Sequence, residues 1–509
     1  MLTEEDIRQI EAHGLNLKTV VRQLEQFAKG IPPTEIVTAA TIGNGIVSCD
    51  AETQQELISY YDTHRRTKTI VKFVPASGAA TRMFRFLFEF LEKFDPEEQT
   101  YNRFVKQGNY PQLEIFAKSL RDFAFVNEVR KKIRKNYPEY KQSRKGQRLL
   151  YFVKSMLEEQ GLNFANLPKG LIPFHKYTKY ATTAFEEQLY EAALYATSKD
   201  DAYLHFTFSE KHVPFFKNEF EAVKSRVGKK TKTEFHVSYS FQKPETDTIA
   251  VTPENEPFRD ENNNLIFRPS GHGALLENLN DVDADIIFIK NIDNVVAQDY
   301  VEETVTYKKM LAGKLLKIQE RVFKYLTMLH RNKDDKGDLA EIKSFLWNDL
   351  NIKDIPETRE AIQTILNRPI RVCGVVQNTG APGGGPFWIK NKFGEISLQI
   401  VETAQINLED ARQAHLVSEA THFNPVDLVC GVKDFKGNKF DLTKFVATNT
   451  GFITTKSQNG KPLKALELPG LWNGAMAKWN TIFVEVPLST FNPVKNVNDL
   501  LHKEHRPNA

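Results

Sequence analysis

The apolar segment at residues 286–289 constrains the fold of this chain more than any other feature of its sequence. It reads Ile-Ile-Phe-Ile and is followed by the polar sequence Asn291-Ile292-Asp293-Asn294. A short apolar run without polar alternation is typical of a strand buried on both faces of a parallel sheet. Because ligands of open α/β sheets bind beyond the carboxyl ends of such strands, we expect Asp293 to lie at that edge, where a carboxylate suits a metal ion.

A glycine-bracketed turn, Gly271-His272-Gly273, precedes this strand. Apolar residues at helical spacing follow the turn, so it is predicted to open a helix. Free backbone N–H groups at the start of a helix favour a polar or anionic ligand. The turn and the strand end together predict that a polar ligand and a metal ion meet there.

A strand-loop-helix unit lies earlier in the chain. It has a strand at residues 70–74, a small-residue loop at 75–80 and an amphipathic helix from Thr81. Outward-pointing N–H groups and a helix N-terminus cradle phosphates in such loops, and Arg82 would add a fixed cation. A plain strand-to-helix turn explains the loop equally well, since a single glycine-containing loop is weak evidence of phosphate binding.

Further candidate residues lie on loops. Lys169 follows a proline, and Lys495 stands in a proline-marked loop before a predicted helix. The segment 378–387 is the most glycine-dense part of the chain, which suits close approach to a ligand, a mobile lid or a plain crossover. A predicted hairpin follows this segment and ends near Glu402.

The alternation of strands and helices predicts a doubly wound, Rossmann-like mixed sheet with helical insertions. Apolar spacing also predicts a helix over residues 3–29, with a capping box between Thr3 and Asp6. The predicted parts are a helical preface at 1–66, an α/β core at 67–306 with a helical insertion at about 95–160, a second helical insertion at 307–370, and a mixed α/β part at 371–509 that completes the core.

Composition narrows the classes of function. Lys and Arg total 68 against 65 Asp and Glu, a net charge of +3, so no overall charge favours nucleic acid or an anionic membrane. The basic stretch at 130–148 is explained by solvated helices, because the rest of the chain is not basic. Three widely spaced cysteines argue against a disulfide framework and fit the cytoplasm. No apolar run approaches the roughly 20 residues that span a bilayer.

Together these features suit transfer at a nucleoside triphosphate. Such a reaction develops charge on phosphoryl oxygens, and positioned cations with a divalent metal ion neutralise that charge. The sequence supplies no convincing Ser/His/Asp or Cys/His set, which disfavours covalent catalysis.

The motifs and their order resemble those of the UDP-sugar pyrophosphorylases, of the UDP-glucose and UDP-N-acetylglucosamine types. The resemblance spans roughly residues 70–500 and is greatest to an uncharacterised bacterial family of that fold. The matching segments are ASGAATRM at 76–83, Pro168-Lys169, PSGHG at 269–273, NIDN at 291–294, ETAQ at 402–405, Phe423-Asn424, and PVK at 493–495.

The resemblance implies the nucleotide-diphospho-sugar transferase fold (GT-A type) and Mg²⁺ as cofactor. It implies UTP and a sugar 1-phosphate as substrates, release of pyrophosphate, and neither nucleic acid nor membrane as partner. By the same resemblance the roles would be catalytic for Arg82, Lys169 and Lys495; nucleotide-binding for Ser77, Gly78, Ala79, Thr81, Gln242, Gly271, His272 and Gly273; sugar-binding for Asn291, Gly384, Glu402 and Asn424; and metal-binding for Asp293.

The chain departs from the family pattern in its phosphate loop, where Ala79 and Ala80 replace the usual glycines. A methyl group there would narrow the space for phosphate, so a non-catalytic nucleotide or nucleotide-sugar binding protein is a second hypothesis. A third is a nucleotide-sugar-dependent glycosyltransferase, which would need an Asp-x-Asp metal motif. Asp283 and Asp285 have that spacing but precede the strand instead of ending it.

Overall fold

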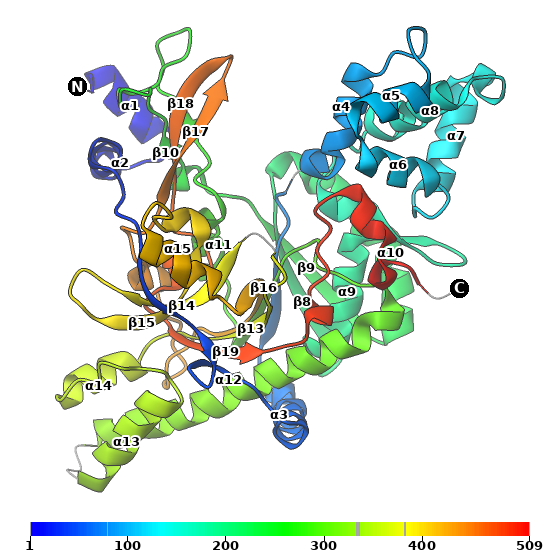
Figure 1. Cartoon of the computed structure of the whole chain (residues 1–509). Helices are drawn as coiled ribbons and strands as arrows, with labels where there is room; N and C mark the ends of the chain where they lie inside the picture. Colours follow the sequence, from blue (N-terminus) through cyan, green and yellow to red (C-terminus); the bar gives the residue numbers. More distant parts are fainter. Residues whose placement is uncertain (1, 79, 332–335, 381–382, 508–509) are drawn as a thin grey trace. The chain divides into compact units, whose positions relative to one another are not determined.

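The chain is an α/β protein built on a large mixed sheet, as predicted. The computed structural model describes residues 2–78, 80–331, 336–380 and 383–507. Figure 1 follows the elements in chain order. The chain divides into two compact units, each assembled from three separate segments: Met1–Phe73, Ser240–Ile289 and Tyr307–Leu488 form the first, and Val74–Tyr239, Lys290–Thr306 and Ser489–Ala509 form the second. The four-part division derived from the sequence stays a prediction.

The main sheet of the first unit contains the strand predicted at residues 286–289. This strand, β12, is buried along its whole length and pairs in parallel with β4, with Ile286 opposite Ile70. The prediction of a buried parallel strand is therefore confirmed. The strand order is β2-β3-β19-β13-β16-β12-β4, and the sheet is mixed because β13 runs parallel to β19 and antiparallel to β16. These strands are β2 (Thr41–Ile42), β3 (Gly45–Val47), β4 (Ile70–Pro75), β12 (Ile286–Lys290), β13 (Ile370–Gln377), β16 (His422–Gly431) and β19 (Asn480–Glu485).

A smaller sheet of the first unit, in the order β1-β14-β15, contains part of the glycine-rich segment. β14 and β15 form the predicted hairpin, in which Gly384 lies opposite Glu402. The loop predicted at 378–387 is thus too long, because backbone pairing draws its end into β14. Residues 381–382 lie outside the described part of the chain. The strands are β1 (Glu35–Ala39), β14 (Gly384–Lys390) and β15 (Ile396–Glu402), and two further antiparallel pairs are β10 (Thr248–Ile249) with β11 (Phe267–Arg268) and β17 (Phe452–Gln458) with β18 (Lys461–Glu467).

The helices of the first unit follow the predicted pattern with one correction. In place of a single helix over 3–29 there are two, α1 and α2, and Gly14 between them has a left-handed φ of 85°. The capping box between Thr3 and Asp6 is confirmed. No helix of the described residues is both long and apolar enough to cross a membrane. The helices wholly or mainly in this unit are α1 (Glu4–Ala12), α2 (Leu17–Lys29), α3 (Ala51–His64), α11 (Leu275–Asn280), α12 (Val301–His330), α13 (Lys336–Asn348), α14 (Arg359–Leu366) and α15 (Ala411–Ser418).

The second unit combines short strands with a cluster of helices. β8 pairs with both β7 and β9, and β5 pairs with β6. Helices α4 to α8, blue to cyan in Figure 1, pack on one another around buried phenylalanines such as Phe90 and Phe116. The strands are β5 (Pro173–Lys176), β6 (Ala181–Thr183), β7 (Thr197–Ser198), β8 (Asp201–Thr207) and β9 (Glu234–Ser240), and the helices are α4 (Arg85–Lys93), α5 (Tyr101–Gly108), α6 (Pro111–Lys118), α7 (Val126–Asn136), α8 (Lys145–Leu157), α9 (Ala184–Tyr195) and α10 (Val213–Thr231).

Two helix predictions in the second unit need correction. After the small-residue loop the chain first forms a 3-10 helix, Ala80–Phe84, and the α-helix predicted from Thr81 begins only at Arg85. The helix predicted after Lys495 is a short 3-10 helix, Val497–Leu501. Asn496 and Asp499 cap this turn reciprocally, so local side-chain bonds favour a compact turn over a longer helix.

Candidate functional site

The residues predicted to contact phosphate and metal all lie in the second unit. Together with Asn291, which was predicted to contact the sugar, we call them the lysine–aspartate group: Ser77, Gly78, Thr81, Arg82, Lys169, Asn291, Asp293 and Lys495. Backbone hydrogen bonds join two of the contributing segments, because the Lys169 N–H donates to the Gly78 carbonyl at 3.2 Å and the Ala80 N–H donates to the Leu167 carbonyl at 3.3 Å. Ala79 lies outside the described residues.

Lys169 and Asp293 form the centre of this group. Nζ of Lys169 donates to Oδ2 of Asp293 at 2.7 Å and to the carbonyl oxygen of Val494 at 2.8 Å. Gly170 permits this approach, since a Cβ there would lie 2.9 Å from Cγ1 of Ile292. The two charged side chains are 15% and 17% exposed, so a ligand from solvent has access to the pair.

Asn294 fixes the segment that carries Lys495. Its Oδ1 accepts from the Asn492 N–H at 2.8 Å, and its amide donates to the Thr490 carbonyl at 3.4 Å. The Lys495 N–H donates to Oδ2 of Asp499 at 2.6 Å. The last residue of the Asn-Ile-Asp-Asn sequence therefore has a structural role.

The lysine–aspartate group has an excess of positive charge. Arg82 and Lys495 are exposed, and neither makes an ion pair with any residue that the structure describes. Nζ of Lys495 lies 5.9 Å from the centre of the Phe491 ring. With Lys169, the group contains three cations and the single carboxylate of Asp293, and this balance favours a phosphate ligand.

Asp293 has the donor chemistry of a magnesium ligand. Its Oδ2 is bonded to Lys169, while its Oδ1 accepts no hydrogen bond from the described residues. Among the described residues, one cluster of three side chains could ligate a metal ion. It consists of Asp201, Glu234 and His236, and Asp293 is not part of it. A single carboxylate completed by substrate phosphates is a common way to hold Mg²⁺, so the residues present fit this ion.

A second cluster, in the first unit, joins two predicted residues to two that were missed. We call His272, Glu402, Trp472 and Asn473 the histidine–glutamate group. The His272 ring stacks on Trp472 with centroids 4.2 Å apart, and its Nδ1 accepts from the Leu471 N–H at 3.0 Å. The ring proton is therefore on Nε2, which lies 3.3 Å from Oε1 of Glu402.

This environment holds Glu402 in its ionised form. The hydrogen bond from His272 lowers the pKa of Glu402, opposed by partial burial and assisted by the amide of Asn473, whose Nδ2 donates to Oε1 at 2.5 Å. The Glu402 N–H donates to Oε1 of Gln405 at 2.9 Å. Glu402 is thus an oriented acceptor for ligand hydroxyl groups, and Gln405 has a capping role.

The glycines of the Gly-His-Gly turn are required by packing within the protein. A Cβ at Gly273 would lie 2.2 Å from the Pro469 carbonyl oxygen, and one at Gly271, whose φ is 82°, would lie 2.5 Å from Oε2 of Glu467. Gly470 is required in the same way, because a Cβ there would lie 2.4 Å from Cε1 of the His272 ring. The turn is closed against residues 467–470, so its glycines alone do not indicate a ligand.

The remaining predicted residues of the first unit differ in how far contacts within the protein already occupy them. Gly384 lies opposite Glu402 in the β14–β15 hairpin. Nε2 of Gln242 donates to Asp247 at 3.1 Å. Asn424 is 3% exposed, and its Oδ1 accepts from the N–H of Val426, a residue with a left-handed φ of 58°. The Asn424 side chain supports this irregular backbone, and its proposed sugar contact stays a prediction.

The Asp-x-Asp alternative finds no support in the geometry. Nζ of Lys433 lies 2.9 Å from Asp283 and 3.4 Å from Asp285, and Asp285 also accepts from the Thr69 N–H at 2.8 Å. These carboxylates are held at the beginning of β12. Trp472 and Asn473 were missed from the sequence; the Pro469-Gly470 turn just before them is the signal that marks this loop.

Comparisons with solved structures find proteins similar in fold along nearly the whole chain. A mutant UDP-glucose pyrophosphorylase from Leishmania major is 14% identical, with 98% of this chain and 79% of that chain covered and a TM-score of 0.45. The uridine diphosphate N-acetylglucosamine pyrophosphorylase from Trypanosoma brucei, in complex with an inhibitor, is 10% identical, with 98% and 79% covered and a TM-score of 0.49. At these values the likeness carries no argument about reaction or substrate.

The curated proteins contain no match to this sequence. A family model described as "Domain of unknown function (DUF4301)" matches residues 3–506, almost the entire chain. The protein belongs to this family.

Proposed function

We propose that the protein is a sugar-1-phosphate nucleotidyltransferase. An oxygen of the sugar phosphate attacks the α-phosphorus of a nucleoside triphosphate, a new P–O bond forms, and the bond from the α-phosphorus to the bridging oxygen breaks, so that pyrophosphate leaves. UTP is the proposed nucleotide, on the resemblance of the motifs to those of UDP-sugar pyrophosphorylases.

One observation carries the proposal: the junction of Lys169 with Asp293 and the Val494 carbonyl. It brings together a lysine, a carboxylate at the end of a buried strand, and the backbone beside Lys495, from three distant segments. A structural ion pair alone does not require two further exposed cations, Arg82 and Lys495, on the same set of segments. Phosphoryl transfer does require them, because charge develops on phosphoryl oxygens.

The side chains of the lysine–aspartate group have distinct roles in this proposal. Lys169 and Arg82 bind the triphosphate, together with the backbone N–H groups of the loop at residues 77–82. Lys495 has an exposed side chain, while its backbone N–H is bonded to Asp499. Its charged end neutralises the sugar 1-phosphate. Asp293 would hold Mg²⁺, which supplies charge neutralisation and orientation of phosphate oxygens. On ligand binding Lys169 exchanges its carboxylate partner for phosphate.

The histidine–glutamate group supports the sugar side of the proposal. Glu402 is ionised and oriented by His272 and Asn473, so it accepts hydrogen bonds from sugar hydroxyl groups. Trp472, behind His272, keeps the imidazole fixed. Gln242 and Gly271 are proposed to read the base, and Asn291, Gly384 and Asn424 to contact the sugar.

Pyrophosphate release across a matrix of nucleoside triphosphates and sugar 1-phosphates, with Mg²⁺, tests the proposal. We expect turnover with at least one pair, and chelation of the metal should abolish it. Binding of nucleotide without turnover for any pair would contradict the proposal and favour a binding protein.

A further inference from the structure

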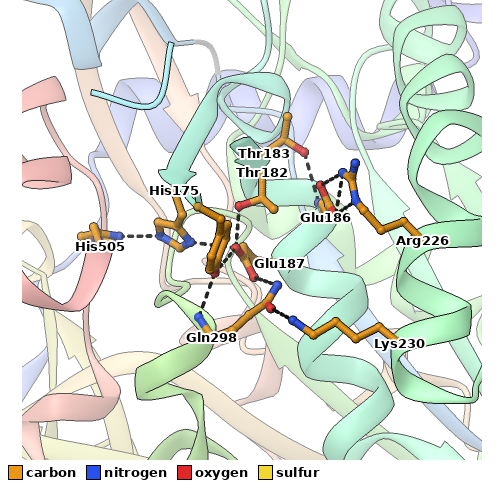
Figure 2. Close-up of polar contacts among 10 residues, drawn as sticks. His175, Thr182, Thr183, Glu186, Glu187, Arg226, Lys230, Gln298 and His505 are labelled. Carbon is orange, nitrogen blue, oxygen red and sulfur yellow. Dashed lines mark hydrogen bonds and ion pairs between the residues drawn. The ribbon is translucent and has the colours of Figure 1, made fainter. Parts of the chain in front are cut away.

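A buried polar network in the second unit has no place in the roles proposed so far (Figure 2). Its centre is Glu187 of α9, whose side chain is 1% exposed. Oε1 of Glu187 accepts from Nδ1 of His175 at 2.9 Å, from the Tyr177 hydroxyl at 2.9 Å and from the Thr182 hydroxyl at 2.6 Å. Three donors from three different residues thus converge on one oxygen, which makes Glu187 the common acceptor of this network.

Gln298 ties the segment 290–306 to the same carboxylate. Its backbone N–H donates to the Tyr177 hydroxyl at 2.9 Å, and its side-chain oxygen accepts from Nζ of Lys230. This bond turns the amide nitrogen of Gln298 toward Glu187, where it donates to Oε2 at 3.4 Å. Both oxygens of Glu187 therefore accept hydrogen bonds.

The network continues to the carboxyl-terminal segment through His505. Nε2 of His175 lies 3.0 Å from Nδ1 of His505, and both rings are buried. Burial, together with the adjacent His175, lowers the pKa of His505 to about 3, so this ring is neutral at neutral pH. One proton between the two rings completes a hydrogen-bonded chain from Glu187 to His505, and Figure 2 marks the contact between the rings with a dashed line.

His505 ends the segment that carries Lys495. One residue earlier, the Glu504 carbonyl accepts from the Ala297 N–H at 2.8 Å. The segment is held near Lys495 by Asn294 and in its middle by Asn498, whose Nδ2 donates to the carbonyl oxygen and to Oε1 of Gln112 at 2.9 and 2.7 Å. Farther along it is held by Glu504 and by the chain from Glu187. The stretch between these anchors, which includes the 3-10 helix Val497–Leu501, contains little regular structure of its own.

Glu186, the neighbour of Glu187 on α9, provides a contrast within the same picture (Figure 2). Its carboxylate is also buried, but it pairs with Arg226 of α10, whose Nη2 lies 2.6 Å from Oε2. Among the described residues it makes no bond to the His175–His505 chain. Two adjacent buried carboxylates thus serve different parts of the unit.

We propose that Glu187 and His175 are positioning residues that hold Lys495 in place by anchoring the carboxyl-terminal segment through His505. This inference rests on the proposed function, in which Lys495 neutralises the sugar 1-phosphate. Glu187→Gln changes the network most specifically, because an amide has only one acceptor oxygen. With that oxygen in the place of Oε1, the new NH₂ group would face the NH₂ group of Gln298, and two donors cannot form a hydrogen bond. Glu186→Gln is the matched control.

Hydrogen exchange of the full-length chain tests the anchor without any assay of activity. We expect Glu187→Gln to speed exchange in peptides covering residues 489–507 about tenfold or more, by the scale of lost hydrogen bonds to a charged group. Glu186→Gln should leave these peptides unchanged and affect α10. Measurements at pH 8 keep Glu186 ionised, since burial raises its pKa to about 7.

A second variant keeps the anchor testable if Glu187→Gln does not fold. His505→Phe removes the ring nitrogens and retains an aromatic ring against Phe174, which meets His505 edge-on at 6.3 Å. It should speed exchange in the same peptides. Unchanged exchange in the variant that folds, or an equal change in Glu186→Gln, would overturn the inference.

Steady-state kinetics test the consequence for Lys495. Glu187→Gln should raise KM for the sugar 1-phosphate and lower kcat about tenfold, with KM for the nucleoside triphosphate unchanged. Added to Lys495→Ala it should cause no further loss, whereas a general structural defect would add to it. A wild-type protein without turnover would refute the proposed function alone, since the exchange result still decides whether the anchor exists.

Discussion

The two groups of candidate residues differ in how far the protein itself satisfies them. In the histidine–glutamate group, stacking, hydrogen bonds and closely packed glycines engage nearly every side chain. In the lysine–aspartate group, Arg82 and Lys495 are exposed and make no ion pair with a described residue, and a Cβ at Gly78 would meet none of the described atoms within 4 Å. The side chains of the first group are held by the protein itself, whereas the second group leaves positive charge exposed. Substitutions in the histidine–glutamate group should therefore mainly lower stability or weaken ligand binding, and those in the lysine–aspartate group should mainly lower activity.

The largest expected effect comes from removing an available charge. Lys495→Ala should lower kcat/KM about 10²–10³-fold, because a group that stabilises transition-state charge is lost. Its thermal unfolding should match that of the wild type, since the side chain is exposed. Lys503→Ala, an exposed lysine on the same segment, is the control and should retain activity; equal losses in both variants would show that Lys495 has no special role.

The same glycine-to-alanine change should separate the two groups. Gly273→Ala should lower the free energy of unfolding by about 1–3 kcal/mol, because its methyl group would lie against the Pro469 carbonyl. Gly78→Ala should change stability by less than about 0.5 kcal/mol, and weaken nucleotide binding if the loop contacts phosphate. Chemical denaturation and nucleotide titration of both variants measure this contrast. A Gly273→Ala protein with the free energy of unfolding of the wild type would contradict it.

The interpretation of the histidine–glutamate group depends on the proton of His272. His272→Phe keeps the aromatic stack on Trp472 but removes both ring nitrogens. It should weaken binding of the sugar side about five- to tenfold, in line with roughly 1 kcal/mol for a lost hydrogen bond. Isothermal titration with each ligand checks this, and an unchanged sugar affinity would remove Glu402 from the proposed site.

The smallest effect concerns the pH dependence of stability. Because the folded pKa of Glu402 is lowered, the ionised side chain stabilises the fold above its unfolded pKa, about 4.3, and this contribution disappears as the pH falls through the folded pKa. The difference in unfolding free energy between wild type and Glu402→Gln should therefore shrink below about pH 4. Urea unfolding from pH 3 to 7 measures it, and a constant difference would contradict the ionised state.

Much of the fold was predictable because short apolar runs and turn residues act locally. The buried strand at 286–289, its parallel partner β4 and the β14–β15 hairpin were all predicted, and each is defined by a pattern within one continuous stretch of sequence. The short strands β1 and β3 were not, because their pairing partners, β14 and β19, lie more than 300 residues away. The break at Gly14 was missed because apolar spacing continues across it.

The candidate site residues likewise divide into those with a local sequence pattern and those without one. Motifs at the ends of strands indicated Asp293 and Glu402, and the structure gives each a specific polar environment. For Trp472 and Asn473 the only local signal is the Pro469-Gly470 turn before them, and the Glu187–His175–His505 chain carries none, because the residues that these side chains contact come from distant segments. Packing constraints were also invisible in the sequence: Gly273 is indistinguishable there from a ligand-binding glycine.

Formation of labelled nucleoside triphosphate from a UDP-sugar and labelled pyrophosphate tests the central claim most directly. With Mg²⁺ and wild-type protein, at least one UDP-sugar should yield labelled UTP, and Asp293→Asn, which removes one charge at nearly constant shape, should lower the rate about 10²-fold or more. Absence of labelled UTP with every UDP-sugar, or a wild-type rate in Asp293→Asn, would contradict the account.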